Sequence, residues 1–145
     1  MFYKHTQIGN LIIATLVVLI LYFGFILNKA GFEQTILMIM VLVLSLLASF
    51  STLNVSIDET NLRIKFGYGI FKKSFLLNEI VSAKSVKNHW YYGWGIRYWF
   101  WPKMRIFNIS GFDAVEIKMI DNKIYRIGTD EPKKLEQAIL ENINL

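Results

Sequence analysis

The stretch that decides the fold of this 145-residue chain is the apolar run over residues 8–27, which reads IGNLIIATLVVLILYFGFIL. It contains no Asp, Glu, Lys or Arg. Twenty residues of α-helix rise about 30 Å, which is the thickness of the hydrocarbon core of a bilayer. A signal peptide would have a shorter apolar run followed by a small-residue cleavage site, whereas this run ends in Asn28-Lys29-Ala30-Gly31. The run therefore predicts a transmembrane helix.

A second apolar run follows at residues 35–53, with Leu, Ile, Val and Met on every face of the helix that it would form. A helix that is apolar all round lies in a protein core or in a membrane, and residues 54–145 are too few to bury two such helices. We therefore predict a transmembrane helical hairpin over residues 1–53, with spans at about 8–27 and 35–53. A separate domain over residues 54–145 would follow it.

Charges around the two runs predict the orientation of the hairpin. The short loop between them carries only Lys29 and Glu33, which cancel, whereas Arg63, Lys65 and Lys72 follow the second run. Basic residues are retained on the cytoplasmic side of a membrane. We expect a multi-pass protein of the cell (inner) membrane whose N- and C-termini are both cytoplasmic.

From residue 54 onward the hydrophobic period changes from that of a helix to that of a strand. Short alternating segments separated by turns predict about seven strands, at residues 53–57, 62–66, 71–77, 80–87, 104–109, 114–120 and 123–127. Residues 129–132 (TDEP) are typical of a helix start, and Leu135, Ala138 and Ile139 then form one apolar stripe. The sequence predicts an α+β membrane protein, with an antiparallel β-barrel or sandwich capped by a C-terminal amphipathic helix.

Composition argues against an enzyme. The chain has no cysteine and only two histidines, His5 and His89, so it offers no disulfide, no thiol nucleophile and no histidine pair at metal-ligand spacing. The Gly67-Tyr68-Gly69 stretch before Lys72 lies between predicted strands, so we interpret it as a hairpin turn with solvated lysines rather than a phosphate loop. We predict no catalytic residue, no metal site and no cofactor.

The most informative segment is residues 89–105, HWYYGWGIRYWFWPKMR, which holds all four tryptophans and no acidic residue. Trp and Tyr favour the headgroup zone of a bilayer, and Lys and Arg add attraction to anionic lipids. One interpretation is an anchor at the membrane interface or a seat for a partner; the other is a loop that packs as core, because a strand here would have to bury indoles on both faces. The predicted interface residues are Trp90, Tyr91, Tyr92, Trp94, Arg97, Trp99, Trp101, Lys103 and Arg105.

Three blocks of sequence, 93–97 (GWGIR), 108–116 (NISGFDAVE) and 127–132 (IGTDEP), resemble a family of bacterial membrane proteins with two N-terminal transmembrane helices and a pleckstrin-homology-like (PH-like) domain. The density of aromatic residues after Arg97 departs from that family. The resemblance implies a PH-like fold and a membrane location, and no catalytic residue. It implies structural roles for Gly93, Gly95, Asn108, Ser110, Gly111, Asp113, Gly128, Thr129, Asp130 and Pro132.

These observations predict a non-enzymatic, membrane-tethered PH-like module that binds or scaffolds on the cytoplasmic face. The alternative is that residues 89–105 sense anionic lipid headgroups. The expected partners are the lipid bilayer, anionic headgroups in the alternative reading, and a protein that the sequence does not identify. The sequence does not decide whether the chain forms a homo-oligomer. Nucleic acid is not expected, because the chain lacks an RNP-type motif and is tethered to a membrane.

Overall fold

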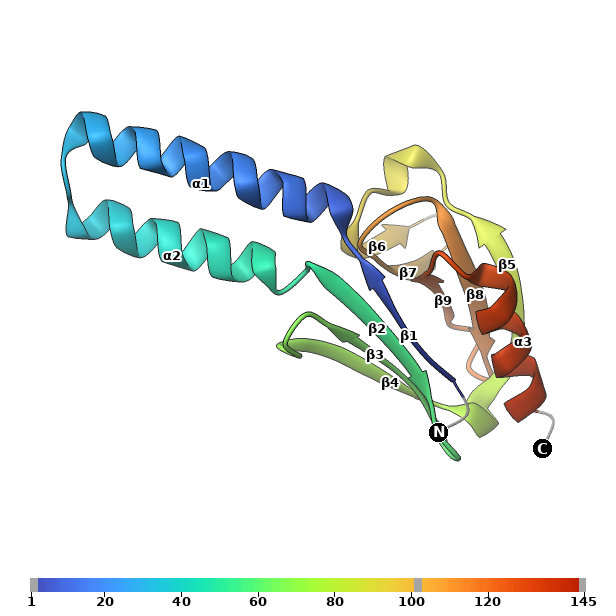
Figure 1. Ribbon diagram of the computed structural model, residues 1–145. Helices are drawn as coiled ribbons and strands as arrows, with labels where there is room; N and C mark the ends of the chain where they lie inside the picture. Colours follow the sequence, from blue (N-terminus) through green and yellow to red (C-terminus); the bar gives the residue numbers. More distant parts are fainter. Residues whose placement is uncertain (1–2, 101–102, 144–145) are drawn as a thin grey trace.

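A computed structural model describes residues 3–100 and 103–143 of the chain, and shows an α+β protein with two β-sheets and an apolar helical hairpin (Figure 1). Within these residues there are three α-helices and nine strands. The elements are β1 (Tyr3–Ile8), α1 (Asn10–Ala30), α2 (Gln34–Ala48), β2 (Thr52–Ile57), β3 (Asn61–Phe66), β4 (Phe71–Leu76), the 3-10 turn η1 (Leu77–Glu79), β5 (Ile80–Lys87), the 3-10 turn η2 (Trp90–Tyr92), β6 (Gly95–Phe100), β7 (Lys103–Asn108), β8 (Asp113–Met119), β9 (Ile124–Gly128) and α3 (Pro132–Ile143).

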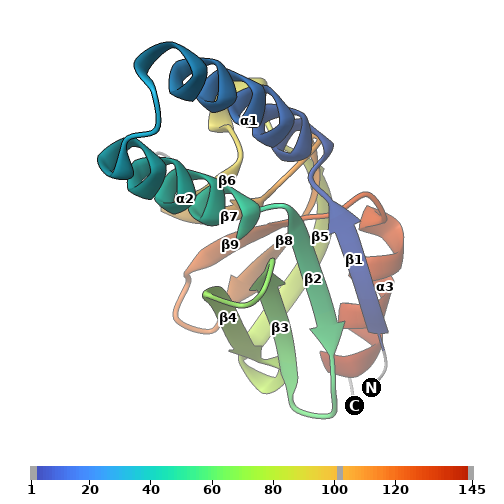
Figure 2. The ribbon, with the colours of Figure 1, turned by 60° about the vertical axis from the view of Figure 1, so that its left-hand side comes forward.

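The helical hairpin is inserted between two neighbouring strands of one sheet. β1 pairs antiparallel with β2, with Tyr3 opposite Ile57 and Ile8 opposite Thr52. Figure 2 shows α1 leaving the end of β1, and α2 returning to the start of β2. Residues 3–8, which we expected to lie with the hairpin, therefore belong to the sheet. The polar run from Lys4 to Gln7 directly before an apolar helix concealed this strand.

The two hairpin helices differ in length. α1 has 21 residues and is long and apolar enough to cross a membrane, and none of its residues is buried. α2 has 15 residues, so the predicted second span at 35–53 is too long: the helix ends at Ala48. Leu53 instead points into the domain core from β2, where it is fully buried. The helix ends before these residues because they pack into the domain core as strand β2.

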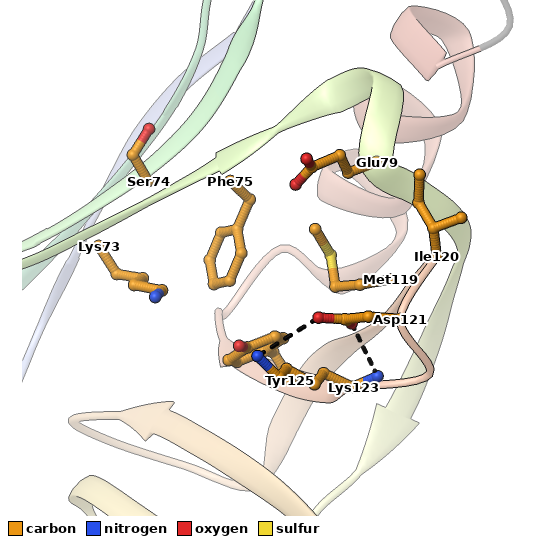
Figure 3. A pocket seen from close by; sticks show the side chains of 9 residues that line it. All are labelled: Lys73, Ser74, Phe75, Glu79, Met119, Ile120, Asp121, Lys123 and Tyr125. Atoms are coloured by element: carbon orange, nitrogen blue, oxygen red, sulfur yellow. Dashed lines mark hydrogen bonds and ion pairs between the residues drawn. The ribbon is translucent and has the colours of Figure 1, made fainter.

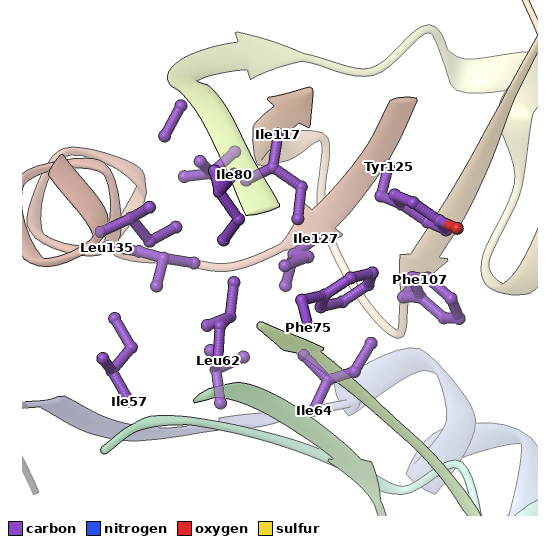
Figure 4. Close-up of a cluster of buried hydrophobic side chains, with 14 of the residues drawn as sticks. Ile57, Leu62, Ile64, Phe75, Ile80, Phe107, Ile117, Tyr125, Ile127 and Leu135 are labelled. Carbon is purple, nitrogen blue, oxygen red and sulfur yellow. The ribbon is translucent and has the colours of Figure 1, made fainter. Parts of the chain in front are cut away.

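The two sheets face each other around the larger of two hydrophobic clusters. β1 to β4 form an antiparallel sheet in chain order, and the second sheet has the order β5-β8-β9-β7-β6. Leu62, Ile64 and Phe75 extend from the first sheet towards Ile117 and Ile127 of the second (Figure 4). Each is almost fully buried, as the alternation of apolar residues predicted.

The predicted antiparallel barrel or sandwich of about seven strands is corrected in three respects. All seven expected strands are present, but β1 and β6 bring the number in the described residues to nine. β7 and β9 pair in parallel, so the second sheet is not wholly antiparallel. The sheets do not close into a barrel, since among the described residues β4 of the first sheet pairs with no strand of the second.

The predicted C-terminal helix is confirmed as α3. Leu135 and Ile139 are fully buried, and α3 packs against β5, β8 and η1. The Glu136 carboxylate accepts hydrogen bonds from the Ser85 backbone N–H (2.9 Å) and from the Ser85 hydroxyl. These bonds favour the ionised carboxylate and lower the pKa of Glu136.

Candidate functional site

The aromatic segment forms η2, β6 and the start of β7, and within residues 3–100 and 103–143 β6 is an edge strand that pairs only with β7. A strand here does not bury large rings on both faces, because most side chains of β6 are exposed. The predicted interface residues that the structure describes lie on several surfaces of the domain rather than in one patch. Trp101 lies outside the described residues.

One part of the segment is packed into a small core. Tyr92 is buried with Met104 and Ile106, and the Trp99 ring lies 4.8 Å from the Tyr92 ring. The Arg126 guanidinium lies 5.7 Å from the centroid of the Tyr92 ring. Tyr92 is therefore a packing residue rather than a residue available to a membrane, and Trp99 is half-buried beside it.

Another part is exposed. Trp90 and Phe100 each retain 76% of their accessible surface, and Tyr91 and Tyr98 are also exposed. Ile96, Tyr98 and Phe100 alternate along β6 and so share one face. Ile96, Tyr98 and Phe100 were not among the predicted interface residues, although their spacing of two residues could have identified them as one stripe.

A cleft of about 550 Å³ joins this segment to the base of the hairpin. The Trp94 indole Nε1–H donates to the Gly111 carbonyl (3.2 Å), and Arg97 Nε donates to the Trp94 carbonyl (3.0 Å). These bonds fix Trp94 and Arg97 beside the first turns of α1. The lining side chains are Leu11, Ile12 and Thr15 of α1, Leu47 of α2, Phe50, and Trp94, Ile96 and Arg97.

Lys103 and Arg105 lie elsewhere, in a cleft of about 530 Å³ at the open edge between the sheets. This cleft adjoins a second one of about 370 Å³ that Figure 3 shows, and Lys73, Lys123 and Tyr125 line both. The Lys73 ammonium lies over the Tyr125 ring, 5.9 Å from its centroid. The predicted basic residues therefore divide between the hairpin base and the sheet edge.

The three sequence blocks of the family resemblance meet at one corner of the domain. Asn108 accepts a hydrogen bond from the Ile109 N–H (2.9 Å) and donates to the Gly111 carbonyl (3.0 Å). The Thr129 N–H donates to the Asp113 carbonyl (3.1 Å), which joins the second block to the third. Trp94, which binds the Gly111 carbonyl, joins the first block to the second. These hydrogen bonds hold the three blocks together.

This corner also holds β1, and through it the start of α1. The Gln7 side-chain amide donates to the Ser110 carbonyl (3.1 Å). His5 Nε2 lies 2.5 Å from the Asp130 carboxylate, and its Nδ1 lies 3.4 Å from Glu131. The motif residues thus support the point at which the hairpin leaves the sheet. Gly93 and Gly95 adopt positive φ angles of 72° and 91°, and Pro132 begins α3.

The predicted hairpin turn at Gly67-Tyr68-Gly69 is confirmed as the β3–β4 turn, Gly67–Ile70, and it also lies at the base of the hairpin. Tyr68 and Ile70 are exposed at its tip, and the Tyr68 hydroxyl donates to the Ser45 carbonyl of α2. The contact of this turn with α2 was not predicted. Tyr68 and Ile70 are the residues in the sequence that could have indicated such a contact.

Among residues 3–100 and 103–143, no group of His, Asp and Glu side chains could hold a metal ion. Comparison of the chain with models of known protein families and with curated proteins gave no match. The base of the hairpin, where the aromatic segment meets α1 and α2, is therefore the candidate functional site.

Proposed function

We propose that this chain is a two-span membrane protein whose two-sheet domain lies on the cytoplasmic face and acts as a non-enzymatic binding or scaffolding module. One observation carries the proposal: an exposed apolar hairpin is inserted between paired strands, with aromatic side chains at its base. A PH-like assignment belongs to the same proposal. Two facing sheets with a C-terminal helix support the PH-like assignment. The parallel pairing of β7 with β9 differs from the wholly antiparallel arrangement that we expected for such a fold.

Exposure of the hairpin supports a membrane location. Leu21 and Leu42 retain 70% and 69% of their accessible surface, and neither helix has a buried residue. A contiguous apolar surface of this kind is rare on a soluble monomer. Removal of α1 as a signal sequence would also remove β1, which pairs with β2 along its whole length.

The pairing of β1 with β2 supports two crossings. Because these strands are neighbours, a chain that crosses in α1 must return before β2. α1 rises about 31 Å and α2 rises about 22 Å, and residues 49–51 complete the return from α2 to β2. The hairpin thus brings the chain back to the side of the domain, which supports two crossings with both termini on one side. The positive-inside rule makes that side cytoplasmic.

Aromatic side chains at the hairpin base support close contact between the domain and the bilayer. Trp94 and Ile96 share a cleft with Leu11 and Thr15, the first turns of α1. If α1 spans the bilayer, this cleft lies at the depth of the headgroups, where indole rings are favoured. Arg97 at the same cleft favours lipid sensing as the second candidate function. Lys103 and Arg105 at the sheet edge leave a separate surface for a protein partner.

Cysteine labelling tests the topology, because the natural chain contains no cysteine. Phe32→Cys places a thiol in the loop between α1 and α2, and Asn78→Cys places one on the domain surface. A membrane-impermeant maleimide added to intact spheroplasts should label Phe32→Cys and should not label Asn78→Cys. After lysis of the spheroplasts, the maleimide should label Asn78→Cys as well. Labelling of Asn78→Cys in intact spheroplasts, or release of the protein by alkaline carbonate, would refute the proposal.

Tryptophan emission of the full chain in vesicles separates the two candidate functions. Lipid sensing predicts a blue shift in phosphatidylglycerol relative to phosphatidylcholine, and loss of that shift in high salt. Arg97→Gln should then abolish it, whereas Lys133→Gln on the exposed surface of α3 should not. A scaffold anchored by aromatic residues predicts the same emission in both lipids.

A further inference from the structure

We propose that the β3–β4 turn, Gly67–Ile70, is a second membrane anchor that inserts Tyr68 and Ile70 into the cytoplasmic leaflet of a phospholipid bilayer. This inference rests on the proposed function, because it requires α1 and α2 to lie in a membrane. It adds a contact from the first sheet to the contact that Trp94 and Ile96 make from the second.

The turn is attached directly to the end of α2. The Tyr68 hydroxyl donates to the Ser45 carbonyl, which lies three residues before the last residue of α2. Gly67 has a φ of 51°, and a Cβ there would lie 2.5 Å from the Ser49 carbonyl oxygen. The Gly67 N–H also donates to the Thr52 carbonyl (2.9 Å). Backbone-to-backbone packing therefore holds the turn against the hairpin.

The length difference between the helices places the turn below the surface of the leaflet. α2 is six residues shorter than α1, which corresponds to about 9 Å of helix. Figure 1 shows that α2 ends before α1 does on the side of the domain, and that the β3–β4 turn reaches that end. Leu47 lines one cleft with Leu11 and Ile12 of the first turn of α1, and Ser45 lies two residues further from the domain along α2. A bilayer that covers α1 would therefore cover Tyr68.

Side chains at the tip suit this environment. Tyr68 and Ile70 retain 58% and 63% of their accessible surface, although the surrounding turn is tightly packed. Lys65 and Lys72 are paired across β3 and β4 immediately behind the tip, and both are exposed. Long basic side chains extend to phosphates while apolar neighbours enter the acyl layer. The occupant that fits this pattern is a phospholipid leaflet.

Quenching by nitroxide lipids tests the inference in the full chain, reconstituted in vesicles of phosphatidylcholine and phosphatidylglycerol. Three single-cysteine variants carry an environment-sensitive fluorophore: Ile70→Cys at the turn, Gly24→Cys within α1, and Asn78→Cys beyond the other end of β4. We expect lipids with a nitroxide near the top of the acyl chain to quench the label at Ile70 several-fold more than the label at Asn78. The emission at Ile70 should also be blue-shifted.

The Gly24 label separates failure of this inference from failure of the proposed function. Quenching at Gly24 without quenching at Ile70 would refute the anchor and leave the membrane hairpin intact. Absence of quenching at both would refute the proposed function. If iodide in water reaches the Ile70 label in vesicles but not in native membranes, a protein covers the turn, and the lipid assignment is wrong.

Discussion

At the scale of single residues, Gly128 is constrained by its contact with Asn108. A Cβ at position 128 would lie 2.0 Å from Asn108 Oδ1 and 2.9 Å from Asn108 Cβ. Asn108 cannot move freely, since its side chain accepts from the Ile109 N–H and donates to the Gly111 carbonyl. We predict that Gly128→Ala lowers the free energy of unfolding by about 1–3 kcal/mol, the range for overpacking a filled site. Urea unfolding of the full chain in detergent measures it.

A double-mutant cycle provides the control. Asn108→Gly removes the three atoms that a methyl group at position 128 would meet. In that background Gly128→Ala should cost much less, because the clash is gone. Equal costs in both backgrounds would show that the contact is not the reason for glycine. The sequence marked both positions through the family resemblance, but only the folded chain shows that they touch.

At the scale of an element, the docking of α3 depends on an ionised Glu136. Ser85 lowers the pKa of this carboxyl below its ordinary value of 4.5. Its contribution to stability is therefore complete above pH 4.5 and is lost as the pH falls through the lower folded-state pKa. We predict that Glu136→Gln lowers the thermal midpoint at pH 7, and that its difference from the natural chain narrows in acid below pH 4.5. Glu141→Gln, at the exposed end of α3, should change the midpoint little at either pH.

Elements were predictable from the sequence where one face is buried and the other is not. The alternation of Leu62, Ile64 and Phe66 predicted β3, and the stripe of Leu135 and Ile139 predicted α3. β1 and β6 were not predicted because both are edge strands: exposed β1 is largely polar, and β6 carries large rings on both faces. The aromatic segment was identified as a candidate site from composition. Its division among a core, a hairpin base and a sheet edge depends on pairing partners distant in the chain.

At the scale of the whole molecule, the hairpin is an insertion into a domain that includes β1. Ile8 and Thr52 are directly opposite each other in an antiparallel pair, so a two-residue Asn-Gly turn can join them in place of residues 9–51. We predict that this linked domain folds without a membrane and unfolds cooperatively. A fragment beginning at residue 52 should be less stable by several kcal/mol, a large share of the total for a domain of this size.

The loss in the fragment has identifiable physical causes. Without β1 the edge of β2 is unpaired, the contacts of His5 with Asp130 and Glu131 are absent, and the buried Gln7 no longer binds the Ser110 carbonyl. Urea unfolding of both proteins measures the difference. A synthetic peptide of residues 1–9 should stabilise the fragment, and a scrambled peptide should not. Equal unfolding free energies would mean that the hairpin, rather than the sheet, holds β1 in place, and the domain would then begin at residue 52.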